Sequence, residues 1–362
     1  MKNLMFSFFF LITLHGWSQP ANEFSFGTEV VISEINIPWG MDWLPNGDML
    51  VTDISGTLYR WNGTKLQAIS GTPEVVAAGQ GGLLDVKVHP DFGKNGWVYL
   101  SYSKPMGGNL ATTAVIRGKL QGNAFVESAE VFRAEPASDT RHHYGSRIVF
   151  DQAGYMYVSV GDRGNRDENP QKLNNHCGKI HRMNDDGSVP RDNPFAGNPI
   201  AMQTIYSYGH RNPQGLAVHP ETGEVWEHEH GPKGGDEVNI IKPKKNYGWP
   251  VISYGINYNG TKFTEITAKD GMEQPEVYWV PSIAPSGMDF VTSDKYGKLK
   301  GDLLVGSLKF GYLHRCDVEG SKIVKEEKYL EGIGRVRNVR QGPDGFVYLG
   351  VEGKGVLRLL PD

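Results

Sequence analysis

Basic and polar residues precede several of the glycines that open apolar, strand-like stretches of this sequence. Arg211 and Asn212 lie in GHRNPQG, His142 and His143 lie in RHHYGSR, and Gln80 lies in GQGG. Such side chains are costly to bury without partners, whereas a neutral imidazole with a pKa of about 6.5 can remove a proton near neutral pH. These residue types therefore predict a polar pocket in which an arginine, an asparagine, a glutamine and a histidine meet.

Three further cations, Lys309, Arg335 and Arg337, lie in GSLKFG and GRVRN. Arg335 and Arg337 are two residues apart, so their side chains point to the same face of a strand. Like charges that gather in one place need an anion, and guanidinium groups suit carboxylates. Taken alone, each residue is typical of a side chain that hydrogen-bonds at the surface or between repeats. Taken together, they favour a rigid ligand that carries several carboxylates.

The segment HEHGPKGGDEVN favours a metal with oxygen ligands. His228 and His230 form only an H-x-H pair, which is a weak zinc signal without further ligands at zinc spacing. The Gly-Pro and Gly-Gly steps expose backbone carbonyls, and Asp236 and Glu237 add carboxylates. Oxygen-rich loops of this kind suit Ca²⁺, and the alternative is a charged surface turn.

These polar groups are attached to a repeat that occurs six times. Each copy is a glycine, a short strand, a turn and a second apolar strand, and the copies begin near residues 40, 82, 145, 215, 287 and 337. The turns use pairs such as Asn46-Gly47, Thr222-Gly223 and Asp344-Gly345, which tolerate the positive φ of tight hairpins. A single hairpin is marginal in water, so six similar units are expected to pack around one axis.

The sequence therefore predicts an all-β fold, a six-bladed β-propeller with four-stranded antiparallel blades. The 46 Gly, 21 Pro, 16 Tyr and 8 Trp fit many tight turns between short aromatic strands. The last blade is expected near residues 337–340, 346–351 and 356–360, and the strand at 26–37 is expected to complete it and close the ring. Long loops are expected at about 101–144, 161–210 and 230–285.

The N-terminal segment predicts export. Lys2 precedes an apolar run at residues 4–14 and small residues near position 18, which is typical of a signal peptide over residues 1–18. Residues 19–362 are then expected to form a single catalytic propeller domain, periplasmic or secreted and without membrane insertion. A net charge of −4 without a basic run gives no nucleic-acid face. Cys177 and Cys316 either pair in an oxidising compartment or remain free.

Several phrases of the chain resemble the soluble quinoprotein glucose and aldose sugar dehydrogenases, which use pyrroloquinoline quinone (PQQ). GQGGLLDVKVHPDF, GDRG, GHRNPQGLAVHP, HEHGPKGGDEVN, NYGWP and SIAPSG are similar to phrases of that family and follow its order. The similarity covers nearly all of residues 19–362, and the family fold is also a six-bladed propeller.

The resemblance implies roles for individual residues. It makes His143 the catalytic base, and it places Arg211 and Asn212 near the reactive quinone oxygens and Gln80 near quinone and sugar. The residues it implies for the PQQ carboxylates are Lys309, Arg335 and Arg337. Those it implies for calcium are the carbonyls of Gly231 and Pro232 at the cofactor, and Glu237 and Tyr247 with Asp236 beside them at a structural ion.

The chain also departs from the family pattern. His142 stands where glucose-specific members have an Asp beside the base, so the sequence does not identify the residue that replaces this Asp as the partner of His143. A polar cofactor contact after GDRG is matched only by Asp167 or Gln171, and the sugar-binding aromatic by Tyr278 or Trp279. The chain is shorter than the glucose-specific type, which favours the broad-specificity aldose branch.

The resulting hypothesis is PQQ- and calcium-dependent oxidation of an aldose at C1 to an aldonolactone. His143 acts as the base, a hydride passes to PQQ, and an external acceptor takes the electrons, because the sequence has no C-x-x-C-H haem motif. The protein is expected to be a monomer or homodimer. The alternatives are a calcium-dependent propeller lactonase or hydrolase, which would want carboxylates in the pocket, and a non-catalytic binding propeller.

Overall fold

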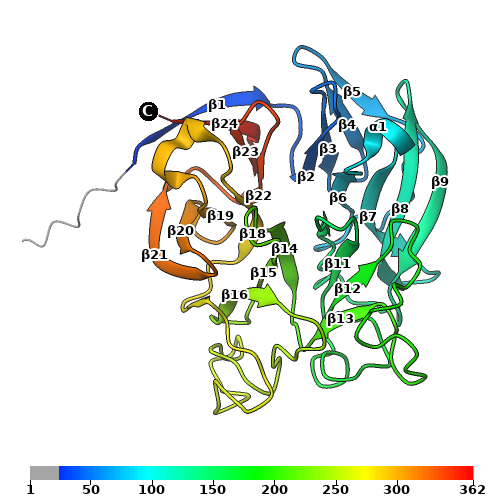
Figure 1. Cartoon of the computed structure of the whole chain (residues 1–362), viewed down its shortest axis with the longest axis vertical. Helices are drawn as coiled ribbons and strands as arrows, with labels where there is room; N and C mark the ends of the chain where they lie inside the picture. The colour runs from blue at the N-terminus through cyan, green and yellow to red at the C-terminus, as the bar shows by residue number, and fades with distance from the viewer. Residues whose placement is uncertain (1–23, 362) are drawn as a thin grey trace, which may run out of the picture.

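The computed structural model describes residues 24–361, which form six four-stranded antiparallel sheets. The innermost strands contact one another in a closed ring, so each sheet is one blade of a propeller (Figure 1). The predicted fold class is thereby confirmed. The signal peptide over residues 1–18 lies outside the described residues and stays a prediction.

The blades follow chain order. Blade 1 comprises β2 (Pro38–Trp43), β3 (Met49–Asp53), β4 (Leu58–Trp61) and β5 (Leu66–Ile69). Blade 2 comprises β6 (Leu83–Val88), β7 (Val98–Pro105), β8 (Ala111–Gln121) and β9 (Ala124–Arg133). Blade 3 comprises β10 (Ile148–Phe150), β11 (Met156–Val160), β12 (Lys179–Met183) and β13 (Ile205–Tyr208).

The other three blades have the same order from the axis outward. Blade 4 comprises β14 (Pro213–Val218), β15 (Val225–Glu229), β16 (Asp236–Ile241) and β17 (Val277–Trp279). Blade 5 comprises β18 (Pro285–Phe290), β19 (Leu303–Ser307), β20 (Leu313–Glu319) and β21 (Lys322–Tyr329). Blade 6 comprises β22 (Val336–Gln341), β23 (Val347–Val351), β24 (Gly355–Pro361) and β1 (Phe26–Ile32). Two short helices, α1 (Phe92–Asn95) and η1 (Asp294–Leu299), lie between first and second strands.

Strand β1 closes the ring, as the sequence predicts. It pairs antiparallel with β24, with Thr28 opposite Leu359, and Figure 1 shows the two strands side by side. The strand ends at Ile32 rather than at residue 37, because residues 33–37 carry the chain from blade 6 across to blade 1. On this crossing, Asn36 accepts a backbone hydrogen bond from Gly353.

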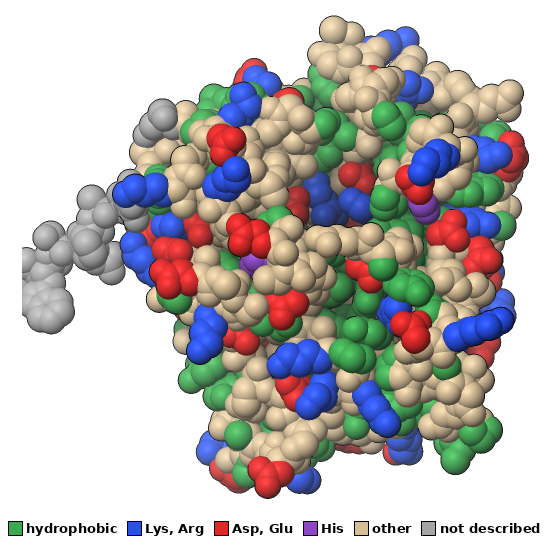
Figure 2. All heavy atoms as spheres, in the orientation of Figure 1, with side chains coloured by type: hydrophobic (Ala, Val, Ile, Leu, Met, Phe, Trp, Pro, Cys, Tyr) green, Lys and Arg blue, Asp and Glu red, His purple; other side chains and the backbone are tan. Residues whose placement is uncertain are grey.

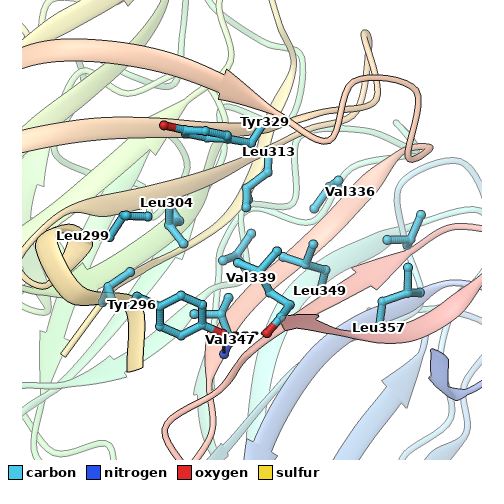
Figure 3. Packing of buried hydrophobic residues seen from close by; sticks show 13 residues of the cluster. Tyr296, Leu299, Leu304, Leu313, Tyr329, Val336, Val339, Val347, Leu349 and Leu357 are labelled. Atoms are coloured by element: carbon cyan, nitrogen blue, oxygen red, sulfur yellow. Dashed lines mark hydrogen bonds between the residues drawn. The ribbon is translucent and has the colours of Figure 1, made fainter. Parts of the chain in front are cut away.

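Hydrophobic packing joins the blades. Six clusters of buried apolar side chains each combine residues of two adjacent blades. In the cluster between blades 5 and 6, Leu304 and Leu313 pack with Val339 and Leu349, and Tyr296 donates its hydroxyl to the carbonyl of Leu359 (Figure 3). Because every blade shares its core with both neighbours, apolar burial fixes the angle between blades and thus the loops above them.

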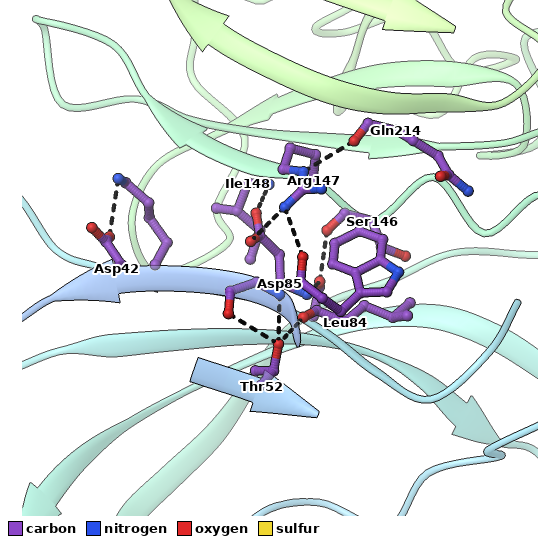
Figure 4. Close-up of polar contacts among 12 residues, drawn as sticks. Asp42, Thr52, Leu84, Asp85, Ser146, Arg147, Ile148 and Gln214 are labelled. Atoms are coloured by element: carbon purple, nitrogen blue, oxygen red, sulfur yellow. Dashed lines mark hydrogen bonds and ion pairs between the residues drawn. The ribbon is translucent and has the colours of Figure 1, made fainter. Parts of the chain in front are cut away.

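A buried ion pair joins four blades near the axis. Arg147 Nη1 lies 3.0 Å from Asp85 Oδ1, and both residues are almost fully buried. Arg147 also donates to the carbonyls of Gln214 and Trp39, and Asp85 accepts from the amide of Ile148 (Figure 4). Since these residues come from blades 1 to 4, this pair, the hub pair, ties four of the six blades together.

The segment at 101–144 and the two cysteines differ from, or go beyond, what the sequence indicates. The segment at 101–144 is not a long loop, because most of it forms the end of β7 and the two longest strands, β8 and β9. The repeat pattern covers only the inner strands, and the run of exposed residues Glu127–Glu130 in β9 hides the alternation. Cys177 and Cys316 are both buried and free, in blades 3 and 5, so they do not pair.

The surface has mixed charge. Figure 2 shows one face that is hollowed at its centre, where acidic and basic side chains meet. Within residues 24–361, no helix is long and apolar enough to cross a membrane.

Candidate active site

His143 is held in an unusual backbone conformation just before β10. Its φ is 57°, a left-handed value that a histidine adopts only where the surroundings impose it. Its amide donates to Gln80 Oε1 at 2.8 Å, so two residues of the predicted site meet here. A Cβ at Gly161 would lie 2.3 Å from the carbonyl of His143, so only glycine allows the loop after β11 to come this close. The imidazole is thus fixed from its backbone outward.

The partner of His143 is Asp162, which the sequence analysis did not identify. Asp162 Oδ1 lies 2.6 Å from His143 Nδ1 and also accepts the amide of Gly164 at 2.7 Å. The second oxygen, Oδ2, accepts the indole N–H of Trp249 at 2.8 Å. Asp162 lies two residues after β11, in the GDRG motif, at the same end of the blade as His143. That position at a strand end is the signal by which it could have been found.

The charges of this pair are set by their surroundings. Burial alone raises the pKa of Asp162, but His143, Arg211 and the Gly164 amide together hold it below its usual value. Burial, followed by the nearby Arg211 guanidinium, lowers the pKa of His143 to about 4. The imidazole is therefore neutral at pH 7. Since the carboxylate only accepts hydrogen bonds, the proton resides on Nδ1 and Nε2 is left as a base.

Arg211 and Asn212 lie beside this pair. Arg211 is 6% exposed, and its Nη1 donates to the carbonyls of His230 and Gly231, each at 2.9 Å. Asn212 is fully buried; its Oδ1 accepts the amide of Gly145 at 3.2 Å, whereas its Nδ2 has no partner. An unpartnered buried donor is what a bound ligand with acceptor oxygens satisfies.

Buried carboxylates gather next to Arg211. Glu229, Glu237 and Tyr247 line one small cavity together with Gly231 and Arg211. Burial, and next the neighbouring Glu229, raise the pKa of Glu237 well above its usual range. Buried acids in such a group favour a bound cation, which restores their ionised form.

Two further titratable groups lie next to Glu229, behind the lining of the acidic cavity. Glu227 Oε1 is buried without a partner, and His210 lies 4.0 Å from Glu227 and 3.3 Å from Glu229. Oxygen donors dominate this set, which is the chemistry that Ca²⁺ selects. The hydroxyl of Tyr247 already has a hydrogen-bond partner, because it donates to the carbonyl of Ile240 at 2.6 Å.

Asp236 holds the chain around the predicted carbonyl ligands. Its carboxylate accepts the amides of Gly231, Ile283 and Ala284 at 2.9, 2.7 and 2.9 Å, together with the hydroxyl of Ser282. Burial raises the pKa of Asp236 to about 6. The buried Pro232 follows Gly231 directly. Asp236 thus links the segment 231–232 to the segment before β18.

The cations expected to meet an anion lie on blades 5 and 6. Arg335 and Arg337 share Glu352, at 2.6 and 2.5 Å, and Arg335 Nη1 donates to the carbonyl of Leu308. This contact places Arg335 beside the exposed Lys309. Glu352, which the sequence analysis did not single out, offsets one of the two guanidinium charges.

Two candidates were named for the polar cofactor contact and two for the sugar-binding aromatic, and the members of each pair differ in environment. Asp167 is exposed and pairs with Arg166 at 3.4 Å. Gln171 bonds inside the protein, to Asn246 and to the carbonyl of Trp249. Trp279 is buried and donates its indole N–H to Glu326, whereas Tyr278 is 46% exposed. Of the two aromatic candidates, Tyr278 is thus the one accessible to a sugar.

Fold and site define a class, a six-bladed propeller with a buried His–Asp pair beside an arginine and an acidic cavity. The family model described as Glucose / Sorbosone dehydrogenase matches residues 35–359, and the chain belongs to that family. The predicted membership is confirmed, as is the prediction that the chain is an enzyme of the sugar dehydrogenase type.

Individual relatives agree with this assignment. The chain is 41% identical to aldose sugar dehydrogenase YliI of Escherichia coli K12, over 92% of this chain and 91% of the relative. It is 30% identical to quinoprotein glucose dehydrogenase B of Acinetobacter calcoaceticus, over 67% of this chain and 56% of the relative. The solved apo structure of the soluble E. coli aldose sugar dehydrogenase gives a TM-score of 0.89 at 39% identity, with 93% and 100% of the two chains covered. The PQQ-bound aldose sugar dehydrogenase of Streptomyces coelicolor gives 0.75 at 28% identity, with 93% and 99% covered.

Proposed function

We propose that this protein oxidises the C1 hydroxyl of aldose sugars to aldonolactones, with PQQ as cofactor and Ca²⁺ as its metal. The observation that carries the proposal is the His143–Asp162 pair, in which Nδ1 of a neutral imidazole lies 2.6 Å from Oδ1 of a buried carboxylate. Such an imidazole is poised to accept a proton through Nε2 and does not need to be activated first.

The residues of the chain perform the proton chemistry. His143 Nε2 removes the proton of the C1 hydroxyl, and Asp162 stabilises the imidazolium that forms. Arg211 stabilises the negative charge that develops beside it, in a site from which water is largely excluded. PQQ, when bound, supplies the two-electron acceptor, which is a chemistry that no amino-acid side chain provides.

The cation set fits a flat ligand with several carboxylates. Lys309, Arg335 and Arg337 would hold these carboxylates, and the half-exposed Arg335 (side chain 53% exposed) has guanidinium surface left for this contact. Asn212, with its unpartnered Nδ2, and Gln80 would contact the polar edge of the ring system.

The acidic cavity beside Arg211 fits calcium. The carbonyls of Gly231 and Pro232 would contact the ion next to the cofactor, and Glu237 and Tyr247, with Asp236 behind them, would belong to a structural ion. The buried Glu229 and the partly buried Glu237 support both assignments, because a divalent cation offsets the cost of burying ionised carboxylates.

The remaining parts of the proposal rest on the sequence. The enzyme acts in the periplasm or outside the cell, as a monomer or homodimer, and gives its electrons to a separate acceptor. An aldose of broad identity is the substrate, and Tyr278 is the candidate aromatic contact for it.

Reconstitution tests the proposal. Purified apo-protein is mixed with PQQ, Ca²⁺, a panel of aldoses and a redox dye, and each component is omitted in turn. Dye reduction that requires PQQ, Ca²⁺ and sugar together supports the proposal. Lactone hydrolysis without PQQ, or sugar binding without any dye reduction, would contradict it. His143→Ala is the matched control, because it removes the base and leaves Arg337 and Glu237 in place.

A further inference from the structure

Trp249 contacts Asp162 from a neighbouring blade. Asp162 and His143 belong to the loops of blade 3, whereas Trp249 lies after β16, in the segment that leads to the outer strand of blade 4. Its indole Nε1 donates to Asp162 Oδ2 at 2.8 Å. Trp249 is 7% exposed, so this hydrogen bond is shielded from water. The base of one blade is thus held by an aromatic side chain of the next.

The hydrogen bond completes the surroundings of a buried carboxylate. Oδ1 of Asp162 accepts from His143 and Gly164, and Oδ2 accepts from Trp249. Asp162 is 1% exposed, so without the indole its second oxygen would be buried with no donor beside it. A carboxylate in that state is less stable when ionised, and its hold on the Nδ1 proton of His143 weakens.

The same indole supports the second candidate catalytic group. The Arg211 guanidinium lies over the ring of Trp249, 5.3 Å from its centroid. Phe263 packs edge-on against the same ring, with the two centroids 5.1 Å apart. The backbone amide of Trp249 donates to the carbonyl of Gly209, two residues before Arg211. One residue therefore fixes Asp162 by a hydrogen bond and Arg211 by ring contact and backbone.

We propose that Trp249 is a positioning residue of the reaction. Its indole N–H orients Asp162, which in turn holds His143 as the Nδ1–H tautomer, and its ring sets the plane of Arg211 beside them. The consequence for catalysis depends on the proposed function, whereas the consequence for His143 is a property of the protein without cofactor. Trp249 acts through these two residues, not by contact with the sugar.

The central test compares Trp249→Phe with Phe263→Leu. The first keeps a packed ring and removes the N–H; the second removes ring packing and keeps the N–H. We expect Trp249→Phe to lower kcat by about 10- to 100-fold with KM within about twofold, as for loss of a hydrogen bond to a charged group. Phe263→Leu should change kcat by less than about threefold. Trp249→His, which retains a ring N–H, should recover part of the loss.

A double-mutant comparison shows whether Trp249 acts through Asp162. In an Asp162→Asn background, Trp249→Phe should lower kcat by less than about twofold further, because the carboxylate that it orients is gone. Equal losses in both backgrounds, or wild-type kcat in Trp249→Phe, would overturn the proposal.

A second measurement needs neither PQQ nor turnover. ¹⁵N NMR of the apo-protein reports the tautomer and pKa of His143, whose facing charged or titratable groups are Asp162, Arg211, His142 and His230. We expect Trp249→Phe to mix the two neutral tautomers of His143 and Phe263→Leu to leave them unchanged. An unchanged His143 spectrum in Trp249→Phe contradicts the proposal even if the enzyme is active. A changed spectrum in a protein that never oxidises sugar contradicts the proposed function alone.

The wild-type protein provides a measurement that does not depend on the folding of Trp249→Phe. The indole N–H resonance of Trp249 is expected at low field and should move upfield in Asp162→Ala. A resonance that is at the same position in both proteins shows that the hydrogen bond does not form in solution, which rejects the proposal.

Discussion

His143 Nδ1 and Asp162 Oδ1 lie 2.6 Å apart although 19 residues separate them in the chain. His143 precedes β10, and Asp162 follows β11, so the first hairpin of blade 3 carries the two residues back to the same end of the blade. The antiparallel turn is what makes a base and its orienting acid into neighbours. Both side chains are then enclosed by loops from blades 2 and 4.

Loss of the base should separate binding from turnover. His143→Ala is expected to lower kcat by about 10²- to 10⁴-fold, the usual contribution of a general base. PQQ binding, followed by its absorption spectrum, should remain, because the cations on blades 5 and 6 are untouched. A variant that turns over at the wild-type rate would exclude His143 from the reaction.

The pH profile should reflect the lowered pKa of His143. With a folded pKa of about 4, the imidazole stays neutral well below the 6.5 of an ordinary histidine. In a plot of kcat/KM against pH, the midpoint of the acid limb should therefore lie below pH 5.5 for the enzyme reconstituted with PQQ and Ca²⁺. A limb centred at 6.5 would show that the imidazole is solvated, contrary to its burial.

The same shift affects stability. Between pH 6.5 and 4 the unfolded chain binds a proton at His143 and the folded chain does not, so this contribution to the free energy of unfolding falls as the pH falls. The His143→Ala variant should lose less stability across that interval. Urea unfolding of both proteins at pH 7 and at pH 5 measures the difference, and parallel losses would contradict the expectation.

Arg337 should contribute to cofactor affinity. Its guanidinium pairs with Glu352 at 2.5 Å, and this contact fixes the orientation in which it would bind a second anion. Arg337→Gln is expected to weaken PQQ binding by about 10- to 100-fold, as for loss of hydrogen bonds to a charged group. The exposed Lys94→Gln removes the same charge away from the site and should not change the affinity. Equal affinities in wild type and Arg337→Gln would remove Arg337 from the cofactor site.

Removal of calcium should destabilise the protein through Glu237. A ligand present at about 100 times its Kd adds about 2.7 kcal/mol to the free energy of unfolding. A chelator should therefore lower the Tm of the wild type, and it should have a smaller effect on Glu237→Gln, in which the buried acid is neutral. Glu265→Gln, at an exposed site, serves as the control. The same chelator response in Glu237→Gln would place the ion elsewhere.

Removing one partner of the hub pair should destabilise the protein more than removing both partners. Arg147→Met leaves Asp85 buried and unpaired, and we expect a loss of about 3–5 kcal/mol in the free energy of unfolding. The double variant Arg147→Met with Asp85→Leu removes both charges and should recover a large part of that loss. Chemical denaturation measures all three proteins, and a double variant no more stable than Arg147→Met would refute this account.

The features that the sequence revealed are those encoded locally. Glycines, turn pairs such as Asn46-Gly47 and apolar strands lie within a few residues of each other, so hairpins, blade number and ring closure were all predictable. His143, Arg211 and Arg337 could be proposed because each occupies the same place in its repeat. The strands β8 and β9 were missed because the repeat pattern does not extend to the outer half of a blade.

The partners of the site residues were less accessible to sequence reasoning. Asp162, Glu352 and Trp249 are defined by what they touch, and each touches residues that are distant in the chain. Glu352 meets Arg337 over 15 residues and Trp249 meets Asp162 over 87. Such pairs depend on blade packing, which a local pattern does not record. His142 occupies the position of the Asp of glucose-specific members, and the carboxylate that contacts His143 comes instead from residue 162.

The pairing of β1 with β24 has a consequence for how this molecule assembles. Arg358 and Glu29, which face each other across these strands, are 329 residues apart. Contacts of such separation form late, since the entropy of closing the intervening chain must be overcome first. Five blades can therefore stack as the polypeptide emerges from the ribosome, but the sixth has to wait for both ends. A cut within β24 should leave an open arc instead of a slightly shorter enzyme.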